Sequence, residues 1–132
     1  SSDVCSSDLL EKETNRGSKK EYLQQLGIDE RMPLSEQYRI VAKQYIEANA
    51  AADILEELKS ATLSQMMQNH ASLPVSRAEM MVKSSSEWTD YINSMVEARK
   101  TSNLKKAQLE WIRMKFSEQQ SREATERAER RL

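Results

Sequence analysis

The stretch SEWTDYINSMVEARKTSNLKKAQLEWIRMKFSEQQSREATERAERRL, residues 86–132, decides the fold of this chain. It contains neither Gly nor Pro, the two residues that most often end a helix. At about 1.5 Å per residue, a helix from Ser86 to Arg131 would be roughly 70 Å long. The stretch therefore predicts one long helix over about 85–131.

Two apolar stripes run along the middle of this predicted helix. The first continues from Tyr91, Met95 and Ala98 to Leu109, Ile112 and Phe116. The second consists of Leu104, Ala107, Trp111 and Met114. A helix that is apolar over so wide an arc usually packs against more than one partner. We expect a neighbouring helix of the same chain on one side and a second copy on the other, with an oligomer interface formed by Leu104, Trp111, Met114, Ile112 and Phe116.

The preceding segment, Glu36 to about His70, supplies the neighbouring helix. Its apolar residues recur at alternating spacings of three and four, and Ser35 stands at its start as a cap. Pro74 ends it, because the residue before proline is pushed out of the helical region. We expect long helices over about 35–70 and 85–131 to form an antiparallel hairpin.

Two shorter helices flank this hairpin. SKKEYLQQLG, residues 18–27, ends on a glycine placed as a C-cap. RAEMMVK, residues 77–83, follows a capping box of Ser76 and Glu79, and a second box of Ser84 and Glu87 precedes the long helix. The predicted fold is all-α: a long antiparallel hairpin with short flanking helices, an extended C-terminal helix and assembly into an oligomeric bundle.

Composition supports this fold class and limits the function. The chain has only 2 Gly and 2 Pro, as helical proteins do. Its 20 Lys and Arg against 21 Asp and Glu give no support to general polyanion binding. No apolar run approaches the roughly 20 residues that cross a bilayer. Aromatic residues make up only 5% of the chain, so one copy can build only a small hydrophobic core. Self-association would bury more apolar surface, and we therefore expect a cytoplasmic homo-oligomer.

The first nine residues, SSDVCSSDL, do not resemble folded structure or a signal peptide. They resemble the translation of a sequencing adapter on an environmental contig, and the alternative is a disordered natural N-terminus. On the first interpretation the natural N-terminus is absent from this sequence. We therefore expect residues 1–17 to be disordered or artefactual and residues 18–132 to form a single helical domain. Cys5, the one cysteine, lies in the suspect stretch.

Catalytic and metal chemistry have little support in the sequence. His70 is the one histidine, and no cysteine or second imidazole lies near it, which argues against a metal site. Two glycines cannot build a glycine-rich phosphate loop. We expect a protein that is not an enzyme and has no cofactor.

The most distinctive local feature is RAEMMVKSSSEW, residues 77–88. A helix N-terminus offers unpaired N–H groups and partial positive charge, which attract anions. Nearby aromatic rings could stack on a base. A phosphate-bearing nucleotide would be held by Arg77, Lys83, Ser84, Ser85, Ser86, Trp88 and Tyr91. The simpler interpretation of this feature is ordinary helix capping beside core aromatic residues.

The long helix also carries basic residues, Arg99 and Lys100 among them. They are better explained as a solvated face than as a nucleic-acid site.

Residues 77–132 also resemble a group of small phage proteins that share an S-x-E-(W/Y) start, a central EAR, an aromatic W-x-R and a closing A-T-x-R-A-E. The matching residues are Ser86, Glu87, Trp88, Glu97, Ala98, Arg99, Trp111, Arg113, Ala124, Thr125, Arg127, Ala128 and Glu129. The resemblance implies an accessory protein, encoded near phage recombination functions, that acts in the infected bacterial cell.

Three functions remain open on this basis. The chain could counter host antiviral defence as a non-enzymatic binding protein, by sequestering a nucleotide immune signal. It could assist phage recombination by binding single-stranded DNA or a recombinase. It could be a structural assembly protein with no ligand. Near-neutral charge and the wide apolar face favour the first over the second.

Overall fold

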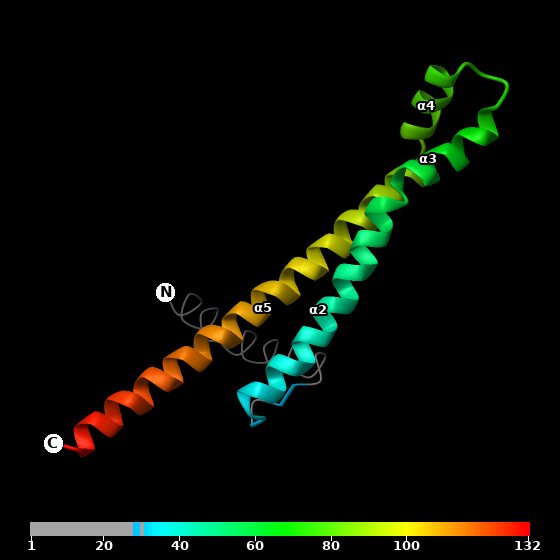
Figure 1. The fold of residues 1–132 in the computed structure, drawn as a ribbon. Coiled ribbons are helices and arrows are strands. Elements are labelled where there is room, and N and C mark those ends of the chain that lie inside the picture. Colours follow the sequence, from blue (N-terminus) through cyan, green and yellow to red (C-terminus); the bar gives the residue numbers. More distant parts are fainter. Residues whose placement is uncertain (1–27, 30) are drawn as a thin grey trace, which may run out of the picture. The chain divides into compact units, whose positions relative to one another are not determined.

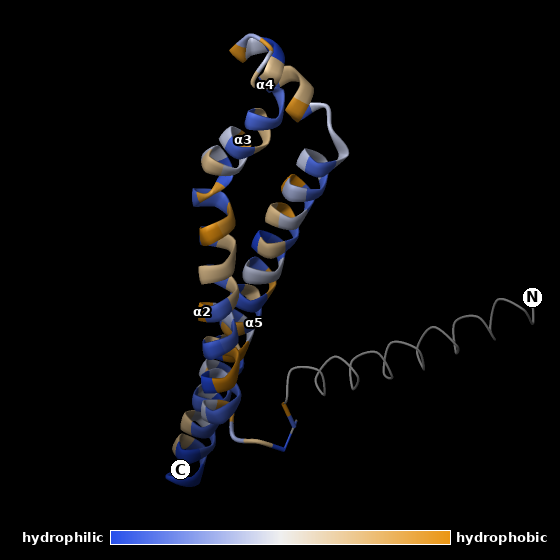
Figure 2. Ribbon diagram, turned by 90° about the vertical axis from the view of Figure 1, so that its right-hand side faces the viewer, coloured by the Kyte–Doolittle hydropathy of each residue, from blue (hydrophilic) through white to orange (hydrophobic). Residues whose placement is uncertain are grey.

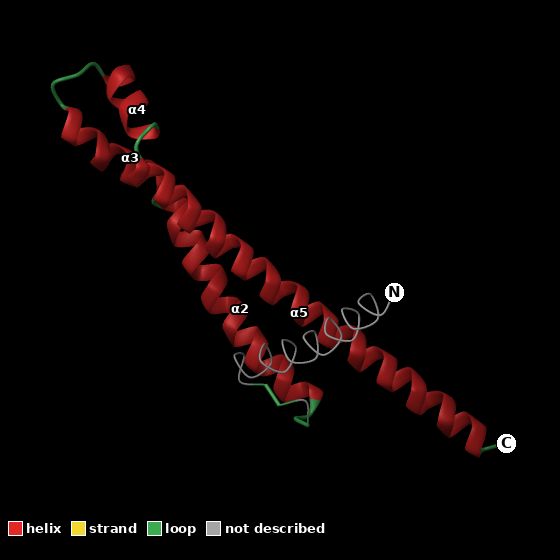
Figure 3. Cartoon of the chain, turned by 180° about the vertical axis from the view of Figure 1, so that it is seen from behind, coloured by secondary structure: helices red, strands yellow, loops and turns green. Residues whose placement is uncertain are grey.

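A computed structural model describes residues 28–29 and 31–132 of the chain. Within these residues all regular structure is helical (Figure 1, Figure 3). The elements are α2 (Leu34–Glu57), α3 (Lys59–Met67), the 3-10 helix η1 (Gln68–His70), α4 (Val75–Lys83) and α5 (Ser86–Arg130). The all-α prediction is confirmed. The helix expected over 18–27, the stretch 1–17 and Cys5 lie outside the described residues.

The chain divides into two compact units, and the division passes through both long helices. The larger unit is Ala42–Trp111. The smaller unit combines Ile112–Leu132 with the described residues up to Val41.

In the larger unit, α2 and α5 run antiparallel. Four side-chain contacts pair them: Gln44 with Lys105, Asn49 with Ser102, Asp53 with Arg99, and Leu55 with Tyr91. Residue numbers rise along one helix as they fall along the other, as the predicted hairpin requires. Ala52 and Ser102 are almost completely buried. Such small side chains allow two helices to approach closely, because the interaxial distance depends on the side chains at the contact.

The smaller unit has its own buried residues, Ile28, Val41 and Ile112, together with the polar Gln37. The Gln37 amide donates to the backbone carbonyl of Met32 over 2.9 Å, so its buried nitrogen is satisfied. The rest of this unit is mostly exposed, and the C-terminal part of α5 is strongly hydrophilic (Figure 2).

One long helix over 35–70 was expected, and the structure corrects this. Leu58 separates α2 from α3, with φ −82° and ψ −1°, and η1 then ends the segment. Backbone bonds still cross the interruption, from Leu58 N to Ile54 O (3.0 Å) and from Thr62 N to Leu58 O (2.8 Å). No Gly or Pro marks the position. The chain turns back through residues 71–74 so that α4 lies beside α3 (Figure 1). Tertiary packing of this kind commonly overrides local helix preference.

The start of α4 also differs from the expected capping box. Pro74 is the N-cap, in an extended conformation, and Ser76 lies inside the helix without a side-chain cap bond. The Pro74 carbonyl accepts from the N–H groups of Arg77 (3.0 Å) and Ala78 (2.9 Å). Proline has a fixed φ that suits the start of a helix, and α4 begins here without a side-chain cap bond.

Candidate functional site

The predicted ligand residues gather around the junction of α4 and α5, where two of the three serine hydroxyls serve the backbone. Ser85, rather than the expected Ser84, caps α5: its Oγ accepts from the Trp88 N–H over 3.3 Å and donates to the Val82 carbonyl. Ser84 closes α4 by donating its hydroxyl to the Met81 carbonyl over 3.0 Å. Ser86 is the first residue of α5 and is exposed.

The two aromatic residues of the predicted site belong to the packed interior of the larger unit. Trp88 is only 7% exposed, and its ring stacks on Tyr91 with centroids 5.7 Å apart. The Tyr91 hydroxyl donates to the Leu55 carbonyl of α2. The half-buried Tyr91 therefore joins α5 to α2, and the buried Trp88 ring, which stacks on Tyr91, is little exposed to a ligand.

The remaining predicted residues meet on α4. Arg77, Lys83 and Ser84 line one hollow of about 640 Å³ together with Ser76, Glu79, Met80 and Met81. Lys83 is paired with Glu79 over 2.8 Å. Within the described part of the chain, the exposed Arg77 guanidinium forms no ion pair or side-chain hydrogen bond. The α4 hollow thus offers one uncommitted cation beside two methionines.

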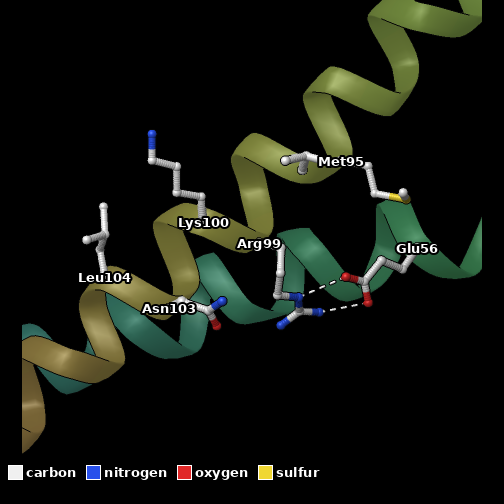
Figure 4. A pocket seen from close by; sticks show the side chains of 7 residues that line it. Glu56, Met95, Arg99, Lys100, Asn103 and Leu104 are labelled. Atoms are coloured by element: carbon white, nitrogen blue, oxygen red, sulfur yellow. Dashed lines mark hydrogen bonds and ion pairs between the residues drawn. The ribbon is translucent and has the colours of Figure 1, made fainter.

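Sequence reasoning missed a polar cluster on the larger unit, which we call the Arg99 clamp: Arg99 with Asn49, Asp53 and Glu56. The guanidinium donates to both Glu56 carboxylate oxygens, over 2.8 and 2.9 Å (Figure 4). It also donates to Asp53 Oδ1 (2.6 Å) and to Asn49 Oδ1 (2.8 Å). The hydrogen bond from Arg99 holds the pKa of Glu56 below its usual value, and the bonds to Glu56 and then Asp53 raise the pKa of Arg99.

The Arg99 clamp could have been predicted from the sequence only if the alignment of α2 against α5 had been known. Asn49, Asp53 and Glu56 recur at spacings of four and three, so they lie along one side of α2. Arg99 reaches them because the two helices are antiparallel. Taken alone, Arg99 resembles any other cation on a solvated face.

A second hollow, of about 470 Å³, lies next to the Arg99 clamp. It is lined by Glu56, Met95, Val96, Arg99, Lys100, Asn103 and Leu104. Arg99 points toward α2, whereas Lys100 and Leu104 point away from it (Figure 4). We call this the α5 hollow. It lies beside the outward face of α5.

The five predicted interface residues separate into two groups. Ile112 is 3% exposed and is buried inside its own chain, so it is not accessible to a second copy. Leu104, Trp111 and Met114 are 55%, 42% and 58% exposed, and Phe116 is exposed as well. Leu104, Ala107, Trp111 and Met114 follow the helical spacing of three and four along the single helix α5, and we call them the α5 stripe.

Other chemistry is not evident in the described residues. Among them, no group of three or more His, Cys, Asp or Glu side chains could hold a metal ion. No helix in that part of the chain is both long and apolar enough to cross a membrane. His70 lies in η1, half-buried.

Comparison of the chain with family models, with curated proteins and with solved structures gives no match. Function is therefore inferred from the chemistry of the two hollows and the α5 stripe.

Proposed function

We propose that this chain is a non-enzymatic assembly protein whose copies associate through the α5 stripe. The observation that carries the proposal is the exposure of Leu104, Trp111 and Met114, three large apolar side chains at helical spacing on one helix. Scattered apolar residues are normal on protein surfaces, but an ordered row of them is typical of an interaction surface.

The energetics favour a reversible assembly. Burying a Leu or Met side chain completely is worth about 1.5–3 kcal/mol. The large residues of the α5 stripe are about half exposed, so each would regain on the order of 1 kcal/mol in an interface. Association itself costs at least about 4 kcal/mol of lost translational and rotational freedom. We therefore expect weak, reversible association, with dissociation constants in the millimolar range or above.

The Arg99 clamp supports this function by fixing α5. A guanidinium bound at both oxygens of Glu56 and also by Asp53 is held in one geometry, because bidentate bonds restrict its orientation. The neighbouring α5 residues Lys100 and Leu104 are then presented on a rigid surface. Preorganisation of this kind lowers the entropy lost on binding.

Sedimentation velocity over a range of protein concentrations tests the proposal. The wild-type chain should sediment faster as concentration rises, and Leu104→Glu should remain monomeric because it places a carboxylate within the α5 stripe. Ile46→Glu is the matched control, since Ile46 is also an exposed apolar residue but lies on α2. A wild-type chain that is monomeric at every concentration would overturn the function, and equal weakening by both variants would overturn the assignment to α5.

A second candidate function is the binding of a small phosphate-bearing ligand, such as a nucleotide immune signal, in the α4 hollow. The grouping of Arg77, Lys83 and Ser84 around one hollow favours it. Recognition would rest on the phosphate and the two methionines, because Trp88 and Tyr91 are committed to the interior. The counter-defence role that the phage resemblance implies, in the cytoplasm of an infected cell, remains a prediction attached to this candidate.

Thermal unfolding against a panel of linear and cyclic nucleotides tests the second candidate, with a short single-stranded DNA as comparator. A ligand at about 100 times its dissociation constant adds roughly 2.7 kcal/mol to stability. The shift should disappear in Arg77→Ala and persist in Arg122→Ala, an exposed arginine of α5. A shift with DNA alone, weakening steeply with salt, would favour the recombination role instead.

A further inference from the structure

We propose that two copies of the chain pair through α5 in an antiparallel register, with the two-fold axis at the level of residue 109. This inference rests on the proposed assembly function and names its partner and geometry. It follows from the order of residues along α5, which is one helix from Ser86 to Arg130.

The α5 stripe is extended at each end by a charged residue. Lys100 precedes Leu104 by four positions, and Glu118 follows Met114 by four. From Lys100 to Glu118 the spacings are four, three, four, three and four, which is the periodicity of a coiled-coil seam. The six positions of this seam are distributed symmetrically about residue 109.

An antiparallel second copy matches side chains of complementary size across the seam. Leu104 of one copy lies opposite Met114 of the other, and Ala107 lies opposite Trp111. The small Ala107 side chain leaves room for the indole of the second copy, so large and small residues interdigitate in the two central layers. Parallel pairing would instead place Trp111 against Trp111 and Ala107 against Ala107.

Charge selects the same arrangement. In the antiparallel register Lys100 of each copy lies opposite Glu118 of the other, so both ends of the seam carry an attractive pair. In the described part of the chain neither Lys100 nor Glu118 forms an ion pair or a side-chain hydrogen bond. Parallel pairing would place like charges together at both ends, which is unfavourable.

Sliding the second copy along the seam removes both the size match of the apolar side chains and the pairing of Lys100 with Glu118. A shift of one heptad in one direction places Lys100 opposite Trp111, and a shift in the other direction places Glu118 opposite Ala107. Each puts a charged group into an apolar layer and leaves other apolar residues facing polar ones. Charged ends and a short apolar centre thus specify one register, as polar seam positions do in coiled coils.

The α5 hollow is placed to receive the second copy. Lys100 and Leu104 line it and point away from α2 (Figure 4). In the proposed register, Met114 of the second copy lies over Leu104 and its Glu118 lies over Lys100. A methionine side chain is flexible and fills irregular gaps well, which suits an open hollow of about 470 Å³.

Charge reversal with rescue tests the register in the full chain. Lys100→Glu and Glu118→Lys each convert both end pairs into like-charge contacts, so each should weaken self-association about tenfold or more. The double variant restores opposite charges and should return to within about threefold of the wild type. Lys43→Glu, at an exposed lysine of α2, is the control and should have no effect. Association that is unaffected by all of these variants would overturn the register while leaving assembly through α5 intact.

Disulfide trapping distinguishes antiparallel from parallel pairing directly. In a Cys5→Ser background, Lys100→Cys and Glu118→Cys chains are prepared separately and oxidised with copper phenanthroline. The antiparallel register predicts cross-linked dimers only when the two variants are mixed. Cross-linking of either variant alone would overturn the antiparallel arrangement. No cross-link in any sample, together with a monomeric wild type by sedimentation, would mean that the proposed function itself has failed.

Discussion

At the scale of single residues, Arg99 shows that a count of charges does not reveal which cations are bonded within the fold. Its guanidinium presents a planar fork of donors that matches a carboxylate at two points, which lysine cannot do. Glu56 accepts from that fork, and Asp53 and Asn49 accept from two of the remaining N–H groups. A residue that the sequence suggested for a solvated or nucleic-acid-binding face is therefore committed to joining α5 to α2.

The lowered pKa of Glu56 predicts how the Arg99 clamp responds to acid. A carboxyl group whose folded-state pKa is depressed stabilises the fold above its unfolded pKa, and this stabilisation is lost as pH falls through the folded pKa. The melting temperature should therefore fall as the pH is lowered through and below the ordinary pKa of a glutamate side chain. Glu56→Gln should start from a lower melting temperature at pH 7 and lose less on acidification. The control is Glu57→Gln, at the exposed neighbouring residue, and an acid response equal to that of Glu56→Gln would contradict this assignment.

At the scale of the helices, the contact between α2 and α5 depends on small side chains. Ala52 has no exposed surface, and Ser102 lies equally deep in α5. The Ser102 hydroxyl is 3.3 Å from Asn49 Oδ1, so the buried oxygen has a partner. Apolar spacing predicted that these two helices would pair.

Enlarging the side chain at the closest point should separate the helices. Ala52→Leu forces extra volume into a packed contact and should destabilise the larger unit by about 1–3 kcal/mol. Ala50→Leu adds the same volume two positions away on the exposed side of α2 and should change stability by less than about 0.5 kcal/mol. Urea unfolding followed by circular dichroism measures both. Equal stability of the two variants would mean that Ala52 is not at a tight contact.

Helix ends were less predictable than helix faces, for physical reasons that differ from site to site. The N-cap of α4 is Pro74 and not a serine, and the cap of α5 is one residue later than expected, at Ser85. A cap depends on which of several adjacent hydroxyls faces the free N–H groups, and a run of three serines does not specify that. The interruption at Leu58 has no Gly or Pro to mark it in the sequence.

At the scale of the whole molecule, composition and periodicity predicted an all-helical chain, an antiparallel pair of helices and the long C-terminal helix. Residue chemistry alone predicted the candidate sites less well. Trp88 and Tyr91 have the side chains of a base-stacking site, but Trp88 is buried, and the half-buried Tyr91 is bonded to the backbone of α2. Leu104, Trp111 and Met114 were assigned to an outer stripe by spacing, and their exposure agrees with it.

If copies of the folded chain associate, stability must depend on concentration. Association draws on the folded state alone, so mass action adds to the free energy of unfolding as the protein concentration exceeds the dissociation constant. Because the partner is another copy of the chain and not a ligand in excess, each tenfold rise in concentration past that point contributes roughly 0.7 kcal/mol per chain. The melting temperature of the wild type should therefore rise steadily over this range in calorimetry. Leu104→Glu should melt at one temperature throughout, because a buried carboxylate opposes association without touching the α2 contact. A wild-type melting temperature that is independent of concentration would show that the exposed apolar row on α5 serves some purpose other than joining copies of this chain.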